Sequence, residues 1–422
     1  MAAEHNLMTD DLLRQIIAVG RVDLLVGAPR IEHPDETPEL VRAVRACFRT
    51  HFARLRTVLL HVDQPEKPDV PALVNRFWDE EAPRGGLRST HLMTTSVPPG
   101  DPDPDHRTTR IMLAAADLLQ ARAVVVLDPD AGDLTVDRIA KLAAPIQEQA
   151  IDLLAPVHPR PADAGLLVTQ LLRPLTRAIY GRDLREPLVP EFGASRRFVE
   201  HCAQLDFEVD RGRWHTQYWM AAEALAGRFG IRQLALGPRR TSVSRARAGL
   251  RAVFQQVITA AFLSIEATAD GWRNASPAGG DPLPDLDDHV GPGESVEAAP
   301  LLEGFEQDLR NLDEILRRIL SPDTHLALKA AAASRDPGPG MPAALWADVV
   351  GQFLLAHHHH VILRDHTVQA LLPLYLARSG TFLREHASSN PVVVEAAVQE
   401  LCGHFDLIKP RIVERWAQPA MR

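Results

Sequence analysis

The apolar run Ala123–Leu127 is followed directly by Asp128, Pro129 and Asp130, and this junction constrains the fold more than any other feature. A short run rich in β-branched residues is typical of a strand that is buried on both faces of a parallel sheet. Two carboxylates at its carboxyl end then lie at the rim of the sheet, where open α/β folds bind their ligands. Carboxylate oxygens at that place suit Mg²⁺, which proteins often share with substrate phosphates. A plain turn is the alternative interpretation, because Asp and Pro also end strands.

Strand-like and helix-like segments alternate through the first part of the chain. The expected strands are Val22–Ala28, Arg56–Val62, Thr90–Val97, Ala123–Leu127 and Ile151–Val157, and the expected helices between them are Thr37–Phe52, Thr108–Gln120 and Thr135–Ala143. Strands that alternate with helices of this length indicate βαβ units, which cross over with right-handed connections. The sequence therefore predicts an α/β fold with a mostly parallel sheet.

From Ser242 onward the apolar periodicity is almost entirely helical. The expected helices are Arg245–Ile265, Leu302–Ile319, Ala343–His360, Thr367–Leu383 and Val392–Phe405. We therefore expect an α/β domain over residues 1–240, which also holds a helix at Tyr218–Phe229 and a strand at Ile231–Leu236, and a helical C-terminal domain over residues 241–422. A stretch rich in Gly, Pro and Asp, near residues 275–299, is typical of a flexible loop.

Composition excludes several classes of protein. The 422 residues are 45% hydrophobic and 24% charged, as in ordinary globular proteins, and the net charge of -9 argues against nucleic acid as a partner. The three cysteines, Cys47, Cys202 and Cys402, lie far apart and show no CxxC spacing, so neither a disulfide framework nor a thiolate zinc site is indicated. No signal-peptide pattern and no apolar run of membrane-spanning length is present, so we expect a cytoplasmic protein.

Two further segments carry polar residues at places where an α/β fold binds ligands. Pro29 and Glu32 follow the first expected strand, where an acidic residue could bind a ribose hydroxyl or a base edge, although a polar surface loop is equally consistent with them. His106 and Arg107 stand at the start of the helix before the central strand, where backbone amides and arginines favour an anion, while the neighbouring Asp105 could be no more than a helix cap. GxGxxG and GxxxxGK[ST] are both absent, which disfavours a dinucleotide site and a P-loop.

The order of these parts resembles the GT-A glycosyltransferases, and most closely their mannosylglycerate synthase and glucosyl-3-phosphoglycerate synthase group. The resemblance starts from the Pro-x-x-Glu loop, the basic helix start and the Asp-x-Asp triplet, and it extends to the Arg-Pro-Leu pattern at Arg173–Leu175 and to the stretch Val189–Ser195, which matches the acceptor loop of that group. It covers residues 20–240 well, and the helical tail with Leu372–Tyr375 loosely. It implies a GT-A fold followed by a helical domain.

The resemblance also implies roles for individual residues. Asp128 and Asp130 would be the catalytic pair: Asp130 would ligate Mg²⁺ or Mn²⁺ at the sugar-nucleotide diphosphate, and Asp128 would contact the ribose or the metal. Pro29, Glu32, His106 and Arg107 would line the donor site together with Asp128, and Gly193, Trp214 and Tyr218 would bind the acceptor. The reaction implied is retaining transfer of a hexose from a GDP-mannose or UDP-glucose type donor to a small polar acceptor such as glycerate or phosphoglycerate.

The chain departs from the pattern of that group at three places, which leaves other functions open. The acceptor loop lacks the usual carboxylate at Phe192–Ala194, and Trp214–Gln217 lacks the acidic residue that the group has near a catalytic position. Gly237–Arg240 lacks the usual metal-binding His, for which His215 could substitute. A catalytically degenerate protein that binds a nucleotide-sugar is one alternative. A Mg²⁺-dependent nucleotidyltransferase is another, because its carboxylates would also bind the metal. The C-terminal helices could supply a homodimer interface or simply cap the α/β domain.

Four consecutive histidines, His357–His360, suggest a metal site at first sight. Four successive positions on a helix spread over roughly 300°, so the four rings cannot converge on one ion. His357 with His360, or with Asp365 and His366, could form a site, whereas a polar stretch on a packed helix is the competing interpretation.

Overall fold

The computed structural model describes most of the chain, namely residues 7–28, 37–63, 70–80, 90–98, 101, 103–128, 134–148, 151–207, 211–237, 249–275, 296–335 and 338–418. The chain forms two compact units, each of several segments. The first comprises residues 1–156, 189–210 and 228–236, and the second comprises residues 157–188, 211–227 and 237–422. Residues 157–188 and 211–227, expected in the α/β domain, thus cluster with the helical part, and a single domain boundary near residue 240 stays a prediction.

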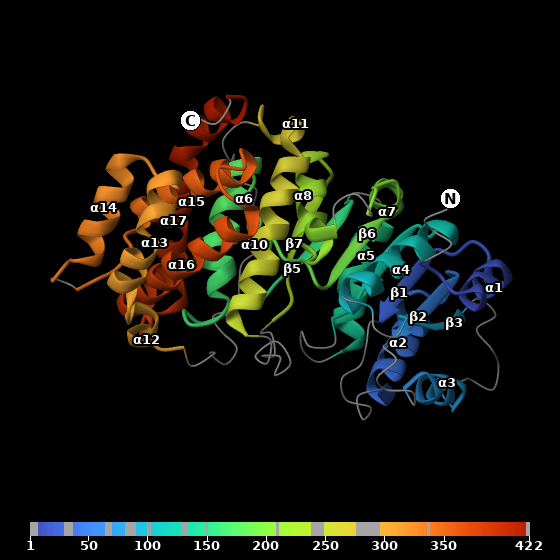
Figure 1. Cartoon of the computed structure of the whole chain (residues 1–422). Helices are drawn as coiled ribbons and strands as arrows, with labels where there is room; N and C mark the ends of the chain where they lie inside the picture. The colour runs from blue at the N-terminus through green and yellow to red at the C-terminus, as the bar shows by residue number, and fades with distance from the viewer. Residues whose placement is uncertain are drawn as a thin grey trace. The chain divides into compact units, whose positions relative to one another are not determined.

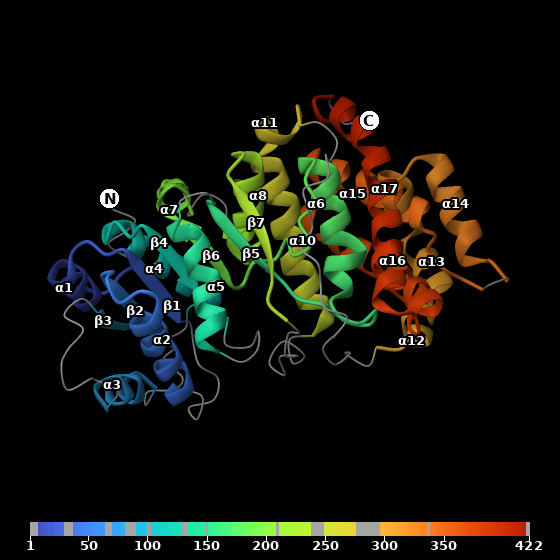
Figure 2. The same ribbon diagram turned by 180° about the vertical axis from the view of Figure 1, so that it is seen from behind.

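The first unit is built on a seven-stranded sheet with the order β3-β2-β1-β4-β6-β5-β7, seen from both sides in Figures 1 and 2. Strands β1, β2, β3 and β4 are mutually parallel, and β6 runs antiparallel between β4 and β5. The strands are β1 (Leu24–Ala28), β2 (Thr57–Asp63), β3 (Thr90–Ser96), β4 (Ala123–Val126), β5 (Leu153–Val157), β6 (Phe192–Ser195) and β7 (Ile231–Ala235). The predicted α/β fold with a mostly parallel sheet is therefore confirmed.

Helices cover both faces of this sheet. They are α1 (Asp10–Val19), α2 (Thr37–His51), α3 (Val70–Glu80), α4 (Pro104–Leu118), α5 (Val136–Gln147) and α7 (Arg196–Ala203). On one face, alternate residues such as Val26 and Val125 join a core cluster with apolar residues of α2, α3 and α5. The opposite face meets α4, because a Cβ atom on Gly27 would lie only 2.6 Å from the Met112 sulfur. The strands are continuous apolar runs because both of their faces are buried.

The second unit is helical. Its elements are η4 (Val168–Leu172), α6 (Arg173–Tyr180), η5 (Arg211–Trp214), α8 (Tyr218–Ala226), α10 (Leu250–Ala267), α11 (Ala269–Trp272), α12 (Ala298–Leu302), α13 (Phe305–Ile319), α14 (Pro322–Ala332), α15 (Ala343–His358), α16 (Arg364–His386) and α17 (Pro391–Trp416). Helix α17 packs on α6 and α15. The Arg173 guanidinium of the Arg-Pro-Leu pattern is bound by Asp183 at 2.8 and 3.0 Å and by Glu395 of α17 at 2.7 and 3.0 Å. This buried arginine therefore braces α6 against α17.

Several elements were not expected from the sequence. Helices α1, α3 and α14 and strand β6 fall where no regular element was predicted. The stretch Val189–Ser195 was expected to be a loop, but Phe192–Ser195 forms a central strand of the sheet. Among the described residues, no helix is both long enough and apolar enough to span a membrane.

Candidate functional site

Polar side chains gather at the carboxyl edge of the parallel strands in the first unit. Because β1, β2 and β4 are parallel and in register, the residues that follow them lie along one edge. Asp63 ends β2, Asp128 follows β4, and both carboxylate side chains are buried. The chain reaches this edge again at the start of α4, since α4 connects the carboxyl end of β3 to the beginning of β4. Such an edge is where open α/β sheets bind ligands.

The start of α4 is held by a local network of carboxylates. Asp103 caps the helix, because its side chain accepts a hydrogen bond from the His106 amide at 3.2 Å, and Pro104 takes the first helical position. The helix thus begins earlier than predicted, and Asp105 lies inside its first turn instead of capping it. Arg107 donates from Nη1 to the Asp101 carboxylate at 3.0 Å. His106 and Arg107 are therefore fixed at the carboxyl edge, with the charge of Arg107 partly neutralised.

An aromatic ring that the sequence did not point to lies against this helix start. The Phe207 ring sits 5.9 Å from the His106 ring, and the Arg110 guanidinium lies over it at 4.4 Å from its centroid. Cations over aromatic faces are stabilised by the ring quadrupole. Phe207 follows α7 in the sequence, far from α4, so only the tertiary fold could place it beside the predicted donor residues.

A second residue missed by the sequence is His61, in the carboxyl-terminal half of β2. Its side chain is fully buried, and neither ring nitrogen makes a hydrogen bond within the described part of the chain. Burial lowers the pKa of His61 to about 4, although the backbone of Ala28, its register partner on β1, offsets part of this effect. The imidazole is therefore neutral at physiological pH. His61 lies within an apolar strand and belongs to no sequence motif, so the sequence did not point to it.

Pro29 and Glu32 of the predicted donor site and the predicted metal ligand Asp130 lie outside the described residues. Of the predicted catalytic pair, the structure thus places only Asp128, directly after the central strand. Among the described residues no group of three His, Cys, Asp or Glu side chains forms a metal site. A buried carboxylate at the sheet edge has the oxygen chemistry that Mg²⁺ and Mn²⁺ prefer, so Asp128 fits such an ion.

Two of the three predicted acceptor residues, Gly193 and Tyr218, have structural explanations in their own units. Gly193 lies within β6, and a Cβ atom there would stand 2.6 Å from the Leu142 carbonyl oxygen of α5. Tyr218 is fully buried in the second unit, where its hydroxyl pairs with the Thr176 hydroxyl at 2.9 Å. Trp214 ends the short helix η5, and its side chain lies outside the described residues. Acceptor binding by these three residues stays a prediction.

The histidine run makes protein contacts at each of its first three positions. His357 is fully buried, and its Nδ1 lies 2.6 Å from the Glu266 carboxylate. The His358 ring stacks on Trp416 at 3.9 Å, with its Nε2 3.2 Å from the Trp416 carbonyl oxygen. The Nε2 of His359 lies 3.0 Å from the carbonyl oxygen of Arg415. His358 and His359 thus bind the carboxyl end of α17, whose last carbonyls lack helical partners, whereas His357 contacts α10.

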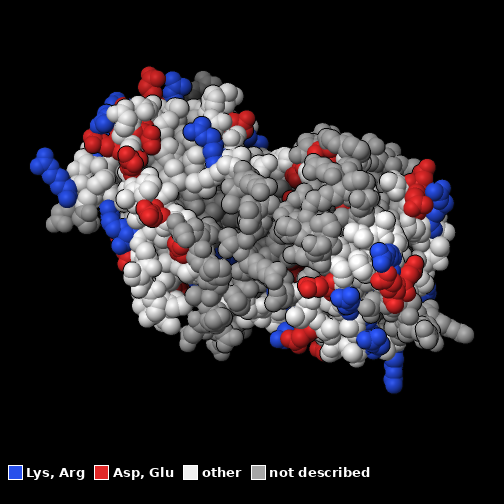
Figure 3. Space-filling view, turned by 90° about the horizontal axis from the view of Figure 1, so that it is seen from below, with Lys and Arg blue, Asp and Glu red and all other residues white. Residues whose placement is uncertain are grey.

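Charges of both signs are mixed on the surface. On the face drawn in Figure 3, the described Lys and Arg side chains alternate with Asp and Glu in small groups. The ion pairs of the described residues include exposed helical pairs one turn apart, such as Lys141 with Asp137 and Arg310 with Glu306. Such exposed pairs contribute little to stability.

No protein-family model matches the sequence, and a search of the curated proteins finds no match. The chain is structurally similar to glycosyltransferases.

Three of these solved structures show the extent of the likeness. Glucosyl-3-phosphoglycerate synthase from Mycobacterium tuberculosis, solved with Mg²⁺ and UDP, is 18% identical with a TM-score of 0.40 over 59% of this chain and 83% of its own. Mannosyl-3-phosphoglycerate synthase from Rubrobacter xylanophilus is 18% identical with a TM-score of 0.43 over 62% and 79%. A mannosyltransferase from Pyrobaculum calidifontis, solved with GDP-mannose and Mn²⁺, is 11% identical with a TM-score of 0.40 over 95% and 94%.

Proposed function

We propose that this protein is a glycosyltransferase that binds a nucleotide-sugar donor at the carboxyl edge of β1, β2 and β4. The observation that carries the proposal is the position of Asp128, a buried carboxylate directly after the central strand of the sheet. The start of α4 lies at the same edge with His106 and Arg107. A carboxylate can bind a metal ion or a ribose hydroxyl, and helix amides and an arginine can bind phosphates. A nucleoside diphosphate requires both kinds of group.

Each described residue has a distinct task in this proposal. Asp128 contacts the ribose or the metal, and His106 and Arg107 bind the diphosphate. Asp101 holds the Arg107 guanidinium in place, which lowers the entropy lost when a phosphate binds. Pro29 and Glu32 line the nucleoside, and Asp130 completes the metal site. When bound, Mg²⁺ or Mn²⁺ would neutralise the negative charge on the leaving diphosphate.

The finer assignments rest on the sequence resemblance. We propose a retaining transfer of a hexose from a GDP-mannose or UDP-glucose type donor to a small polar acceptor of the glycerate class. Gly193, Trp214 and Tyr218 are the proposed acceptor-binding residues. We also propose that the protein works in the cytoplasm and that its C-terminal helices form a homodimer.

One competing function follows from the missing partners of the site. The carboxylate and the histidine that complete the site in the resembling group have no counterpart at Phe192–Ala194 and Gly237–Arg240. A protein that binds a nucleotide-sugar without transferring the sugar would also need the polar residues at the carboxyl edge of β1, β2 and β4. A Mg²⁺-dependent nucleotidyltransferase would use the same carboxylates on a nucleoside triphosphate.

Thermal unfolding of the full chain with a panel of nucleotides separates these functions. GDP-mannose, UDP-glucose and the matching nucleoside diphosphates, each with Mg²⁺ or Mn²⁺, should raise the melting temperature through preferential binding to the folded state. Release of the nucleoside diphosphate with glycerate or 3-phosphoglycerate present then reports transfer. Binding without release would support the non-catalytic function. Stabilisation by nucleoside triphosphates alone would support the nucleotidyltransferase.

A further inference from the structure

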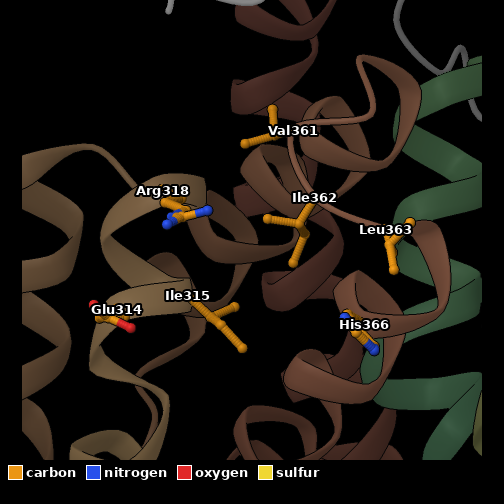
Figure 4. Close-up of a pocket in the computed structure, with 7 residues that line it drawn as sticks. All are labelled: Glu314, Ile315, Arg318, Val361, Ile362, Leu363 and His366. Atoms are coloured by element: carbon orange, nitrogen blue, oxygen red, sulfur yellow. The ribbon is translucent and has the colours of Figure 1, made fainter.

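A pocket opens in the second unit between α13 and the turn that joins α15 to α16. Its volume is about 370 Å³, within the lower range of small-ligand pockets. Figure 4 shows its seven lining residues: Glu314, Ile315 and Arg318 come from α13, Val361, Ile362 and Leu363 from the turn, and His366 from the first turn of α16. The donor-site residues described above belong to the first unit, so none of them lines this pocket.

The centre of the pocket is apolar. Ile315 and Ile362 extend into the space between α13 and the turn from opposite sides, and Val361 adds a third aliphatic side chain (Figure 4). All three are only partly buried, so apolar surface is left facing the pocket. Covering that surface with an apolar group would release water and favour binding.

Three exposed polar side chains around this centre lack protein partners among the described residues, in contrast to their neighbours on α13. Glu314, Arg318 and His366 make no hydrogen bond or ion pair within the described part of the chain, although Glu314 and Arg318 stand one helical turn apart. One residue earlier, Asp313 binds Arg317, Lys329 and His325, with Arg317 at 2.8 Å, Lys329 at 2.6 Å and His325 at 3.1 Å. The pairing that neutralises one face of α13 is thus missing on the face that lines the pocket.

Two residues of the turn beside the pocket are not the residue types that would make this turn most stable. His360 adopts a left-handed backbone conformation with φ of 52°, which favours glycine or asparagine. Leu363 precedes α16 at the capping position without a side-chain hydrogen bond, and it is 70% exposed. A Ser, Thr, Asp or Asn at that position would stabilise the helix, because its side chain accepts a hydrogen bond from a backbone amide of the first turn. Departures of this kind are expected where a sequence serves binding instead of folding.

We propose that this pocket binds a zwitterionic ligand with an apolar side chain, of the amino-acid or short-peptide class. Arg318 and His366 offer donors to a carboxylate, Glu314 offers acceptors to an ammonium group, and Ile315, Val361 and Ile362 cover the apolar side chain. A ligand with one charge would leave either Glu314 or Arg318 without a partner. A zwitterion with an apolar side chain is therefore the class of ligand that can contact both the charged and the apolar residues of the lining.

Three probes of the same shape separate the charges in an experiment on the full-length protein. Leucine carries both charged groups, 4-methylpentanoate carries only the carboxylate, and 3-methylbutylamine carries only the ammonium. Saturation-transfer NMR titrations should show that leucine binds about tenfold more tightly than either singly charged probe, since one charge-assisted hydrogen bond accounts for such a factor. Equal binding of leucine and one of the singly charged probes would overturn the zwitterionic assignment, as would no leucine binding.

Matched variants test the location of the site. Arg318→Gln and Ile362→Ser should each weaken leucine binding by about five- to tenfold. Arg317→Gln is the control, because Arg317 lies next to Arg318 in the sequence but binds Asp313 and does not line the pocket. If Arg318→Gln left leucine binding unchanged while its melting temperature matched the parent protein, leucine would bind elsewhere and the pocket assignment would be wrong.

Discussion

Arg138 of α5 holds Glu191 through two parallel hydrogen bonds, from Nε to Oε1 at 3.1 Å and from Nη2 to Oε2 at 2.6 Å. Both side chains are buried, with 7% and 2% of their surface exposed. Glu191 directly precedes β6, the strand that inserts antiparallel between β4 and β5. The pair therefore fixes the start of a strand that the sequence presented as a loop.

Removing the charge of Glu191 should destabilise the protein strongly. The Glu191→Gln variant would leave the Arg138 guanidinium buried without its carboxylate, which costs about 3–5 kcal/mol. Urea unfolding followed by circular dichroism gives the free energy. The double variant Arg138→Met with Glu191→Leu should lose less than Glu191→Gln alone, because it buries no unpaired charge. A loss below about 1 kcal/mol for Glu191→Gln would contradict this explanation.

Acid should destabilise the first unit through His61. Its pKa is lowered to about 4 in the folded protein, against about 6.5 in the unfolded chain, so the unfolded state binds more protons between these values. The stability that neutral His61 contributes is complete above about pH 6.5 and is lost as the pH falls toward 4, by about 3 kcal/mol in total.

Variants of two histidines can isolate this effect. In the His61→Leu variant, the free energy of unfolding should change less between pH 7 and pH 4.5 than in the parent protein, because one site of preferential protonation is gone. The control is His51→Asn, since His51 lies exposed at the end of α2. Identical pH profiles for His61→Leu and the parent protein would show that His61 does not dominate acid unfolding.

Two glycines should respond in opposite directions to alanine. A Cβ atom at Gly193 would lie 2.6 Å from the Leu142 carbonyl oxygen and 3.0 Å from Ile146, so Gly193→Ala should cost about 1–3 kcal/mol. At Gly403 in α17, no atom of the described residues lies within 4 Å of the added Cβ apart from the neighbouring residues and the backbone of α17 itself, so Gly403→Ala should stabilise its helix by up to about 1 kcal/mol. Thermal melting measures both. If Gly193→Ala left the melting temperature unchanged, close packing would not explain this glycine, and the proposed acceptor role would explain it better.

The end of α17 should loosen when the His358 ring is removed. His358→Ala loses the stacked contact with Trp416 and the hydrogen bond to its carbonyl oxygen, which together contribute about 1–2 kcal/mol. Hydrogen exchange should rise in the last turns of α17. His360→Asn is the matched control, since His360 is exposed and asparagine tolerates its left-handed backbone. Equal exchange rates in the last turns of α17 in the two variants would show that His358 does not stabilise this end of the helix.

The donor-site proposal makes a prediction about two carboxylates. Asp130→Ala should abolish Mg²⁺- or Mn²⁺-dependent turnover of the nucleotide-sugar, and Asp128→Asn should reduce it by about a hundredfold or more, because both lose charge beside the diphosphate. Asp137→Asn should leave turnover unchanged, since Asp137 is exposed on α5 and pairs with Lys141. Full activity in Asp130→Ala would refute the metal role, while a folded Asp128→Asn that still binds donor normally would refute the role of Asp128.

Strands buried on both faces could be predicted from the sequence, because a short continuous apolar run is stable only where both faces of the strand are covered. Ala123–Leu127 illustrates this, as do the register partners of β4 on β1. Strand β6 could not be read in this way. Its four residues, Phe192–Ser195, include a glycine and an alanine, and they form a strand only because β4 and β5 offer open edges on both sides. Its pairing partners are distant in sequence, so no local pattern specifies it.

The sequence by itself determined the α/β class, the place of the central strand and the position of Asp128 at its end, because local periodicity and burial of apolar runs fix these features. Only the tertiary structure decided which polar residues meet. It placed Phe207 against His106 and Arg110, buried the His61 ring, and enclosed Tyr218 in a core. It also placed His358 and His359 against the end of α17. These contacts join residues far apart in the chain, and packing of whole elements, not local spacing, brings such residues together.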